Sequence, residues 1–562
     1  MNKKWELINV NEEAAEKIAT KFNISKLVAR ALVNKGITED EKIEVFLSPR
    51  RGDFYNPFLM PDMEKAVERV VKAIQNKENI TIFGDYDVDG ITSSSILHRF
   101  LKDCGLNSKI YIPNRITEGY GLNNEAVKNI AKDGTTLIIT VDCGITGIAE
   151  VELAKTLGVD VVITDHHEPA EQLPKAVAVV DCKRKDNTYP FNGLAGCGVA
   201  FKLAQGISKK LKLPEEKYLK YLDIVCVGTI SDIVPLEDEN RVISKLGLRL
   251  LNQTKNPGLK ALLESTAYKK IDSTAVSFGL APRINACGRM GHEEEALKLF
   301  LTDDFDEAKR LTEKLNEYNT KRQDIERAIF VEAQKMMEEP KMKQSSCIVL
   351  GGENWHHGVI GIVSSKITDM YAKPSILICF EGQEAKGSGR SIPGFDLHEA
   401  LENCKDNIKQ FGGHSMAVGL TIETSKFESF KEELEKYAEK MKVSEYVPVI
   451  KIDQKISLND INISEIKSLE MLEPYGEANK TPVFQINNVK IESIRTLSEG
   501  KHLRLTVKDE SKTINCIGFN MGKLAEEYPL GSKIDLVGNL EINEYRGIQN
   551  VQINLKDIRH SV

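Results

Sequence analysis

The stretch NITIFGDYDVDG, residues 79–90, joins a short apolar run to three aspartates. Comparable apolar runs recur at 137–141, 159–164 and 177–180, and amphipathic helical patterns separate them. Short buried runs that alternate with helices are typical of a parallel β-sheet with helices on both faces. We therefore predict an α/β domain with a parallel sheet over residues 46–292.

The rest of the chain divides into segments with different patterns of apolar and polar residues. With 562 residues, it is long enough for about three to five domains. Helical periodicity returns after residue 292 without a broad apolar stripe, which favours a rod between two domains. Beyond residue 445, about five short alternating strands suggest a small β-barrel of the OB type. The predicted segments are a helical N-terminal segment (1–45), the α/β domain (46–292), a connecting helix (293–339), a smaller α/β domain (340–445), and a linker with an OB-like domain (446–562).

The composition excludes several classes of protein. The chain is 41% hydrophobic and 28% charged, which is ordinary for globular domains. It has no apolar run near the ~20 residues of a membrane span and no signal-peptide core at its start. The ten cysteines include no C-x-x-C pair, so we expect reduced thiols in a cytoplasmic protein. The net charge of −7 gives no bulk attraction for nucleic acid, which leaves a local patch or a metal site.

Acidic and imidazole side chains follow the apolar runs at the point where each run ends. They are Asp85, Asp87 and Asp89 after the first run, Asp142 after the second, Asp165, His166 and His167 after the third, and Asp232 after the strand-like run VCVGTIS. Because the carboxyl ends of parallel strands form one edge of a sheet, we expect these groups to meet there. Without cations, so many carboxylates would repel one another strongly.

Divalent metal is the simplest compensation for this repulsion. An oxygen-rich set with one or two imidazoles suits Mn²⁺ or Mg²⁺ better than a thiolate-rich zinc site. An aspartate between two ions would hold them roughly 3.5–4 Å apart, and such a pair can activate water and stabilise the leaving oxygen of a phosphate ester. Any single aspartate could instead cap a helix or close a turn, so the prediction depends on the whole set.

A second set of candidates is cationic and rich in glycine. It comprises Ser388 and Arg390 in a glycine-loosened loop, Gly412, Gly413 and His414 before a strand, and Arg115, Arg283 and Arg289 among Gly, Asn and Pro. Glycines let backbone N–H groups approach an anion, while Arg and His add charge-assisted donors. A tight turn or a structural ion pair is the alternative for each. His356 and His357 could bind phosphate or metal, or cap the following helix.

The predicted barrel carries candidates for contact with a single strand. They are the cations Lys501, Arg504, Lys508 and Arg546, and the aromatic residues Phe519 and Tyr545, which are stacking or core residues. OB barrels commonly bind single strands through stacking and backbone contacts, but here this is an analogy at the level of the fold.

In order and spacing, the motifs GDYDVDG, VDCG, TDHH and SD resemble those of the DHH phosphoesterase superfamily. The segments LAGCGVAFKLA, APRINACGRM, NWHHGVIGIVSSKI, FGGHSMAVG and LEPYGEANKTPVF resemble its bacterial exonucleases specific for single-stranded DNA. The resemblance spans residues 45–562. It implies a DHH domain, a long helix, a smaller DHH-associated domain and an OB-like barrel.

The resemblance also implies an activity, which is degradation of single-stranded DNA from the 5′ end to 5′-mononucleotides with Mn²⁺ or Mg²⁺, in recombination and repair. A narrow channel between the two α/β units would admit one strand and exclude a duplex. Single-stranded DNA is the implied partner. A single-strand-binding protein and a RecQ-type helicase are further candidates.

The roles of individual residues follow from the same resemblance. The metal ligands would be Asp85, Asp87, Asp89, Asp142, His166 and Asp232, with Asp142 between the ions. His167 and Asp165 would be catalytic, with His167 in contact with the phosphate. The DNA 5′ end and the scissile phosphate would be bound by Arg115, Arg283, Arg289, Ser388, Arg390, Gly412, Gly413 and His414. Smaller superfamily members begin the first motif with His, where this chain has Asp85.

Two other functions remain open at this point. The chain could be a DHH phosphodiesterase or pyrophosphatase that acts on short oligonucleotides or small nucleotides, although these enzymes typically lack the OB-like domain. It could also be a non-catalytic nucleic-acid scaffold. The intact acidic motifs favour an enzyme, because a scaffold gains nothing from concentrated, mutually repulsive carboxylates.

Overall fold

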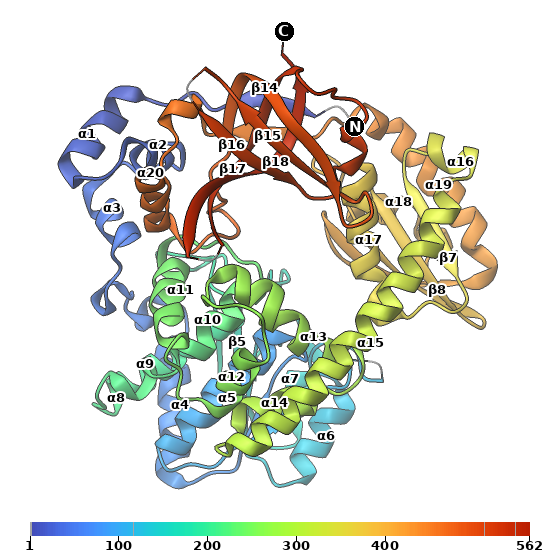
Figure 1. Cartoon of the computed structure of the whole chain (residues 1–562). Coiled ribbons are helices and arrows are strands. Elements are labelled where there is room, and N and C mark those ends of the chain that lie inside the picture. The colour runs from blue at the N-terminus through green and yellow to red at the C-terminus, as the bar shows by residue number, and fades with distance from the viewer. Residues whose placement is uncertain (1–2, 116, 511, 546, 562) are drawn as a thin grey trace.

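The computed structural model describes residues 3–115, 117–510, 512–545 and 547–561. Arg546 lies outside the described residues. Figure 1 shows three bodies joined in one chain: a large α/β unit at the bottom, a smaller one at the right, and a β-barrel at the top in red.

The large unit is built on a five-stranded sheet in the order β3-β2-β4-β5-β6, and every pairing is parallel. Its strands are β2 (Ile80–Phe83), β3 (Lys109–Tyr111), β4 (Leu137–Val141), β5 (Asp160–Asp165) and β6 (Ala178–Asp181). Helices α4 (Met63–Asn76), α5 (Val88–Asp103), α6 (Asn124–Lys132), α7 (Ile148–Thr156) and α8 (Gly196–Lys210) lie around it. This confirms the predicted parallel-sheet domain.

The strands are apolar on both faces because both faces are covered. Every residue of β2 and β4 is buried. Ile80 and Ile82 belong to the core cluster that includes α4, α5 and α8, whereas Phe83 and Ile138 belong to the cluster that includes α6 and α7. Alternate residues of a strand point to opposite faces, so a doubly covered sheet needs continuous apolar runs.

After the sheet, the large unit becomes helical, and one prediction fails here. The helices are α9 (Glu216–Leu219), α10 (Leu222–Ser231), α11 (Asp238–Leu251), α12 (Pro257–Glu264), a π-helical turn η3 (Ala275–Leu280), α13 (Ala281–Arg289) and α14 (Glu293–Leu301). The strand-like run VCVGTIS is the buried helix α10, and Asp232 is its C-cap. Because α10 is buried on all sides, its sequence shows no helical period and reads like a strand.

One long helix links the two α/β units. Helix α15 (Phe305–Met337) has 33 residues, and Asp304 caps it by accepting from the backbone N–H of Glu307. Leu311 and Leu315 belong to the core of the large unit, whereas Ile329 and Ala333 belong to a core shared with the smaller one. The connecting helix is therefore confirmed, although a break before Asp304 separates it from α14.

The smaller unit has a mixed five-stranded sheet in the order β10-β11-β9-β8-β7. Its elements are α16 (Pro340–Gln344), β7 (Ile348–Gly352), α17 (His357–Tyr371), β8 (Ser375–Glu381), β9 (Glu384–Arg390), α18 (Leu397–Asn403), β10 (Gln410–His414), β11 (Ala417–Glu423) and α19 (Phe427–Lys440). Only β7 and β8 pair in parallel among the described strands of this sheet.

The glycine-rich motifs of this unit lie in strands. Ser388 and Arg390 belong to β9 instead of a loop, whereas the GGH motif ends β10 and precedes the strand β11, as predicted. A Cβ on Gly387 would lie 2.7 Å from Leu420 Cδ2, and one on Gly389 would lie 2.8 Å from Leu397 Cδ2. The glycines leave room for side chains that pack across the sheet. In the sequence alone, the same glycines suggest a flexible loop.

The last domain is a closed barrel. It consists of β14 (Phe484–Leu497), β15 (His502–Lys508), β16 (Thr513–Gly518), β17 (Lys533–Tyr545) and β18 (Ile548–His560). The order β14-β15-β16-β18-β17 is closed by pairing between β14 and β17, and the short β13 (Gln454–Lys455) adds to β14. This confirms the predicted OB-like barrel.

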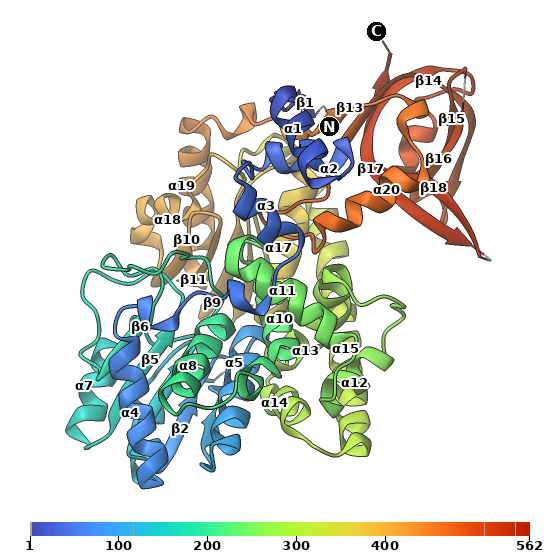
Figure 2. The ribbon, with the colours of Figure 1, turned by 90° about the vertical axis from the view of Figure 1, so that its left-hand side faces the viewer.

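The N-terminal segment packs with the barrel. Helices α1 (Glu12–Phe22), α2 (Lys26–Asn34) and α3 (Asp40–Leu47) share one hydrophobic core with α20 (Ile463–Ser468) and the barrel strands. Figure 2 shows these helices beside the linker that leads to the barrel. A short strand, β1 (Lys4–Leu7), pairs in parallel with β12 (Val449–Ile452); the sequence did not predict it.

The described residues include no helix long and apolar enough to span a membrane. All ten cysteines are free, and nine of them are buried. They behave as small apolar core residues, as their scattered spacing predicted.

A single buried cation ties three segments together. Arg241 of α11 is 1% exposed and stacks on the ring of Phe46, with its guanidinium carbon 3.4 Å from the ring centre. It donates to the carbonyl oxygens of Phe46 (2.7 Å), Leu472 (3.1 Å) and Glu473 (3.0 Å). These acceptors belong to the N-terminal segment and to the linker before the barrel.

We expect Arg241→Met to lower the free energy of unfolding by about 3–5 kcal/mol, because several buried carbonyl groups lose their donor. Urea unfolding followed by circular dichroism measures the loss. Arg249→Met, at an exposed position of the same helix, is the matched control and should change stability by less than about 0.5 kcal/mol. Equal stability of the two variants would contradict the role given to Arg241.

Candidate metal centre

The carboxyl ends of three neighbouring strands bring the acidic motifs together. Asp85 follows β2, Asp142 follows β4, and Asp165 is the last residue of β5. Asp142 adopts the left-handed conformation (φ 60°), and its backbone N–H donates to the carbonyl oxygen of Thr164 at 3.1 Å. A Cβ on Gly196 would lie 2.6 Å from Asp142 Cβ, so the start of α8 closes over this carboxylate.

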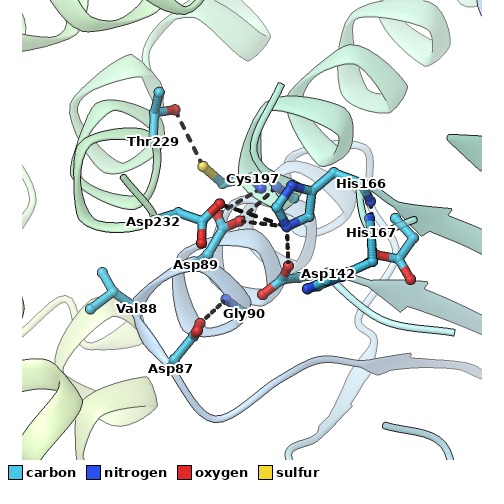
Figure 3. A network of polar contacts seen from close by, with 12 residues as sticks. Asp87, Val88, Asp89, Gly90, Asp142, His166, His167, Cys197, Thr229 and Asp232 are labelled. Atoms are coloured by element: carbon cyan, nitrogen blue, oxygen red, sulfur yellow. Dashed lines mark hydrogen bonds and ion pairs between the residues drawn. The ribbon is translucent and has the colours of Figure 1, made fainter. Parts of the chain in front are cut away.

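Three overlapping groups of potential ligands share this edge, and one of them joins Asp142, His166 and His167. Asp85, Asp87 and Asp142 have carboxylate oxygens within 4.8 Å of one another, and so do the ligand atoms of Asp89, His166 and Asp232. Figure 3 shows His166 pointing toward Asp89, Asp142 and Asp232. Its Nε2 atom lies 3.1 Å from Asp142 Oδ1, 3.8 Å from Asp89 Oδ2 and 3.7 Å from Asp232 Oδ2. The six side chains therefore form two adjacent groups, with Asp142 between them.

Two orphaned atoms support metal at this place. Asp85 Oδ1 and His166 Nε2 are buried and make no hydrogen bond among the described residues; the 3.1 Å contact of His166 Nε2 with Asp142 Oδ1 lacks hydrogen-bond geometry. A buried polar atom without a partner costs free energy unless an ion or water completes it. The donor set of five carboxylates and one imidazole fits Mn²⁺ or Mg²⁺, so the residues present fit a pair of such ions.

Local backbone contacts fix the ligands in place. Asp89 accepts from the backbone N–H groups of Gly196 (2.6 Å) and Cys197 (2.9 Å) at the start of α8. Asp87 caps α5 by accepting from the Gly90 N–H at 3.1 Å. The helix-cap alternative raised for single aspartates is therefore true of Asp87, which nonetheless lies in the first ligand group.

The site is electrostatically unfavourable without cations. Burial raises the pKa of Asp85, Asp142 and Asp232 well above the usual value, and the neighbouring carboxylates raise it further. Burial also lowers the pKa of His166 to about 4, which leaves its ring neutral and able to coordinate a metal. Divalent ions would reverse these tendencies by compensating the carboxylate charge.

Asp165 differs from the other aspartates because its oxygens are already engaged. It accepts from the backbone N–H of Ile145 at 2.9 Å and of His166 at 2.7 Å, and from Nδ1 of His167 at 2.7 Å. Burial alone would raise the pKa of Asp165, but the bond to His167, the charges of His167 and His166 and the Ile145 N–H together outweigh this and lower it. Burial likewise opposes the charge on His167, yet Asp165 raises the pKa of that ring.

Three of the predicted cations gather beside the first ligand group. Burial lowers the pKa of Arg289 to about 10, and the charges of Arg115 and Arg390 lower it further. Arg289 donates to the carbonyl oxygen of Gly358 at 2.8 Å, so it is held across the boundary between the two α/β units. Arg115 lies over the ring of Tyr86, at 4.9 Å. Cations that repel one another in a buried place form a natural anion site.

The remaining predicted residues fall at three places. Ser388 lies beside Arg390, whose Nη1 donates to its Oγ at 3.4 Å. Arg283 donates to Asn316 Oδ1 at 2.6 Å and so ties α13 to α15. His414 faces the large unit and lines a cavity of about 600 Å³ together with His166 and Asp232. Gly412 and Gly413 precede it in β10, and a Cβ on Gly413 would lie 2.3 Å from the Ala417 carbonyl oxygen.

The two adjacent histidines of α17 have structural partners. His356 caps the helix, with its Nδ1 accepting from the Gly358 N–H at 3.1 Å. Nδ1 of His357 lies 2.8 Å from Glu381 Oε1. Of the open alternatives for this pair, helix capping is the one observed for His356.

Sequence reasoning missed two residues of the site. The hydroxyl of Tyr120 lies 3.1 Å from His167 Nδ1 and 3.4 Å from the carbonyl oxygen of Asp142. Lys183 lines the cavity beside His166 and Asp232. The one available signal was that Tyr120 stands between two glycines close to Arg115, whereas Lys183 lies in an unremarkable polar loop.

Comparison with known proteins defines the family. The DHH family N-terminal domain matches residues 79–229, the DHHA1 domain matches 344–440, and the RecJ OB domain matches 452–557. The chain is 38% identical over 560 residues to the single-stranded-DNA-specific exonuclease RecJ of Bacillus subtilis (strain 168), covering 99% of this chain and 70% of that one. This chain belongs to the RecJ family.

Crystal structures of RecJ from Thermus thermophilus extend the similarity to the whole fold. The Mn²⁺ complex matches with a TM-score of 0.87 at 29% identity, covering 100% of this chain and 80% of that one. The Mg²⁺ complex matches with a TM-score of 0.80 at 28% identity, covering 100% and 79%. Their Mn²⁺ and Mg²⁺ ions are those predicted for the oxygen-rich centre of this RecJ-family chain.

Two substitutions should change stability in opposite directions. A carboxyl group whose pKa is raised by folding destabilises the protein at pH values above its unfolded pKa, and a group whose pKa is lowered stabilises it there. In EDTA at pH 8, Asp142→Asn should therefore raise the free energy of unfolding by about 1 kcal/mol. Asp165→Asn should lower it by about 1–3 kcal/mol.

Urea unfolding with and without Mn²⁺ measures both effects. Mn²⁺ should stabilise the wild type, since it binds only the folded state, and should stabilise Asp142→Asn much less. Destabilisation by Asp142→Asn in EDTA would contradict the repulsive character of the centre.

Proposed function

We propose that this chain is a metal-dependent 5′→3′ exonuclease that degrades single-stranded DNA to 5′-mononucleotides. The observation that carries the proposal is the joint placement of two acidic ligand groups and a buried arginine cluster at the boundary between the α/β units. The named activity of the Bacillus subtilis relative, a single-stranded-DNA-specific exonuclease, supports the same substrate.

The polarity rests on the asymmetry of the cations. Arg115, Arg289 and Arg390 lie on one side of the carboxylates and provide donors for a terminal phosphate. A strand whose 5′-phosphate binds there presents its first internal phosphate to the carboxylate cluster. Such binding would fix the bond that breaks and make the released product a 5′-mononucleotide.

The chain's own residues hold the reacting groups. Asp85, Asp87, Asp89, Asp142, His166 and Asp232 would hold two Mn²⁺ or Mg²⁺ ions, which would supply Lewis acidity and activate water. Nδ1 of His167 lies 2.7 Å from Asp165 Oδ1, and Asp165 raises the pKa of that ring. When the ring is protonated, Asp165 accepts from Nδ1 and Nε2 is the atom that can donate to a phosphate oxygen. We assign Asp165 as a positioning residue and His167 as the catalytic residue.

Other features support the biological setting that we propose. Participation in DNA recombination and repair would bring a single-strand-binding protein and a RecQ-type helicase as partners, since both present or generate single strands. Ten free cysteines and the lack of a membrane-spanning helix among the described residues support a cytoplasmic location.

The two alternative functions explain fewer features of the structure. A phosphodiesterase or pyrophosphatase for small nucleotides has no use for the barrel and its shared core with the N-terminal helices. A non-catalytic scaffold has no use for mutually repulsive carboxylates with orphaned ligand atoms.

End-labelled single strands test the proposal. With Mn²⁺, a 5′-labelled strand should release labelled mononucleotide at once, whereas a 3′-labelled strand should lose its label only at the end of digestion. EDTA and Asp142→Asn should each abolish the reaction. Release that begins at the 3′ label would refute the polarity, and a matched duplex serves as the control substrate.

Arg390→Ala should separate phosphate binding from metal binding. Loss of one charge-assisted contact should raise the KM for 5′-phosphorylated strands by roughly tenfold to a hundredfold and leave strands with a 5′-hydroxyl less affected. Steady-state kinetics and Mn²⁺ titration calorimetry measure the two quantities. A large loss of Mn²⁺ affinity would contradict this division of roles.

A further inference from the structure

The cavity of about 600 Å³ lies on the side of the metal centre opposite the arginine cluster. Its polar lining includes Glu168, Lys183, Asn192 and His414, and it reaches His166 and Asp232. This lining comes from the loops after β5 and β6, the loop before α8, the end of α10, and β10 of the smaller unit.

Different contacts place the arginine cluster and the cavity at different ends of the metal centre. Helix α13, which carries Arg289, packs on the first motif, where Asn285 Oδ1 accepts from the Val88 N–H at 3.2 Å. The charge of Arg115 acts on Asp85. By contrast, the charge of Lys183 acts on His166 and Asp232. One cationic group therefore faces the Asp85–Asp87 end of the centre, and another faces the His166–Asp232 end.

Lys183 is held at the cavity by a weak and replaceable contact. Its ammonium lies 3.5 Å from Glu168 Oε1, and both side chains are partly exposed (32% and 64%). An exposed ion pair of this length contributes little and exchanges readily for a better anion. The exposed Asn192 and His414 add donors to the same cavity.

The cavity continues away from the metal centre, as a strand would require. Ile233 and Val234 line both this cavity and a second one of about 540 Å³, whose lining includes Lys480 and Lys556. Ile233 is 71% exposed and adopts a left-handed conformation (φ 61°), which is rare for a β-branched residue. The path therefore leads from Asp232 toward the linker and the barrel, and not into a closed pocket.

We propose that Lys183 forms a subsite for the phosphate on the 3′ side of the scissile phosphodiester. This subsite rests on the proposed exonuclease activity and adds to it. The 5′-phosphate binds the arginine cluster, the scissile phosphate binds at the carboxylates, and the next phosphate binds Lys183. The subsite makes the enzyme favour a strand that continues over a dinucleotide that ends.

Two short substrates isolate this subsite. The dinucleotide pTpT has the 5′ and scissile phosphates, whereas pTpTp adds one phosphate on the 3′ side. For the wild type, kcat/KM should be roughly tenfold higher for pTpTp, the effect of one charge-assisted contact. Lys183→Gln should bring kcat/KM for pTpTp down to the value for pTpT in the same variant, and so remove this preference.

Two further variants control the comparison. Lys185→Gln removes an exposed lysine two residues away and should keep the preference. Glu168→Gln frees Lys183 from its ion pair and should keep or increase the preference. A preference that survives in Lys183→Gln, or that is absent from the wild type, overturns the subsite. Equal loss of both substrates together with Mn²⁺ affinity overturns it as well, because Lys183 would then act through the ions.

A binding measurement separates the subsite from the activity. Competition of pTpT and pTpTp against a fluorescent 5′-phosphorylated strand, with Ca²⁺ in place of Mn²⁺, reads affinity without requiring turnover. Tighter binding of pTpTp that depends on Lys183 supports the subsite even if hydrolysis fails, and hydrolysis that fails in Mn²⁺ overturns the proposed function. Equal binding of the two competitors overturns the subsite alone.

Discussion

Mutual repulsion among buried carboxylates is the constraint around which the large unit is organised. Asp85, Asp142 and Asp232 are forced together where burial and neighbouring charge both oppose ionisation. The fold offsets part of this repulsion with backbone donors, such as the N–H groups of Gly196 and Cys197 on Asp89. The remainder is relieved either by protonation of some carboxylates or by bound cations, so affinity for divalent metal follows from the same geometry that makes the metal-free, ionised site unfavourable.

The smaller unit supplies basic side chains that the acidic edge of the large sheet lacks. Helix α15 shares cores with both units and sets the distance between them. Through it, Arg390 and His414 of the second sheet face the carboxylates of the first. An acidic edge suited to divalent cations and a basic edge suited to phosphate thus face each other, and neither alone would bind a strand in a defined position.

This separation of charge explains why the net charge was a poor guide to the substrate. The total of −7 includes the ligand aspartates, which two divalent ions would offset by about four charges. The cations that matter are few and local: the arginine cluster on one side and Lys183 on the other. For a phosphate-binding enzyme, the position of these groups relative to the metal decides more than their sum.

Whether a feature could be predicted from the sequence depends on how far apart in the chain the interacting residues are. The meeting of Asp85, Asp142 and His166 could be predicted because each comes just after an apolar run, and parallel strands end at one edge. The strands of the barrel could be predicted because side-chain alternation is local. Predictions failed at the VCVGTIS run and the glycine-rich GSGRS, where burial on all sides and cross-strand packing decide the conformation.

The sequence by itself therefore determined the parallel sheet, the acidic and imidazole groups at its edge, and the barrel, since these depend on residue type and short spacing. Tertiary structure alone decided that Asp165 is engaged with His167 while Asp85 keeps an orphaned oxygen, although both aspartates follow strands. It alone placed Tyr120 and Lys183 beside the centre. The physical reason is that a side chain's partners are set by contacts between segments far apart in the chain, which no local pattern records.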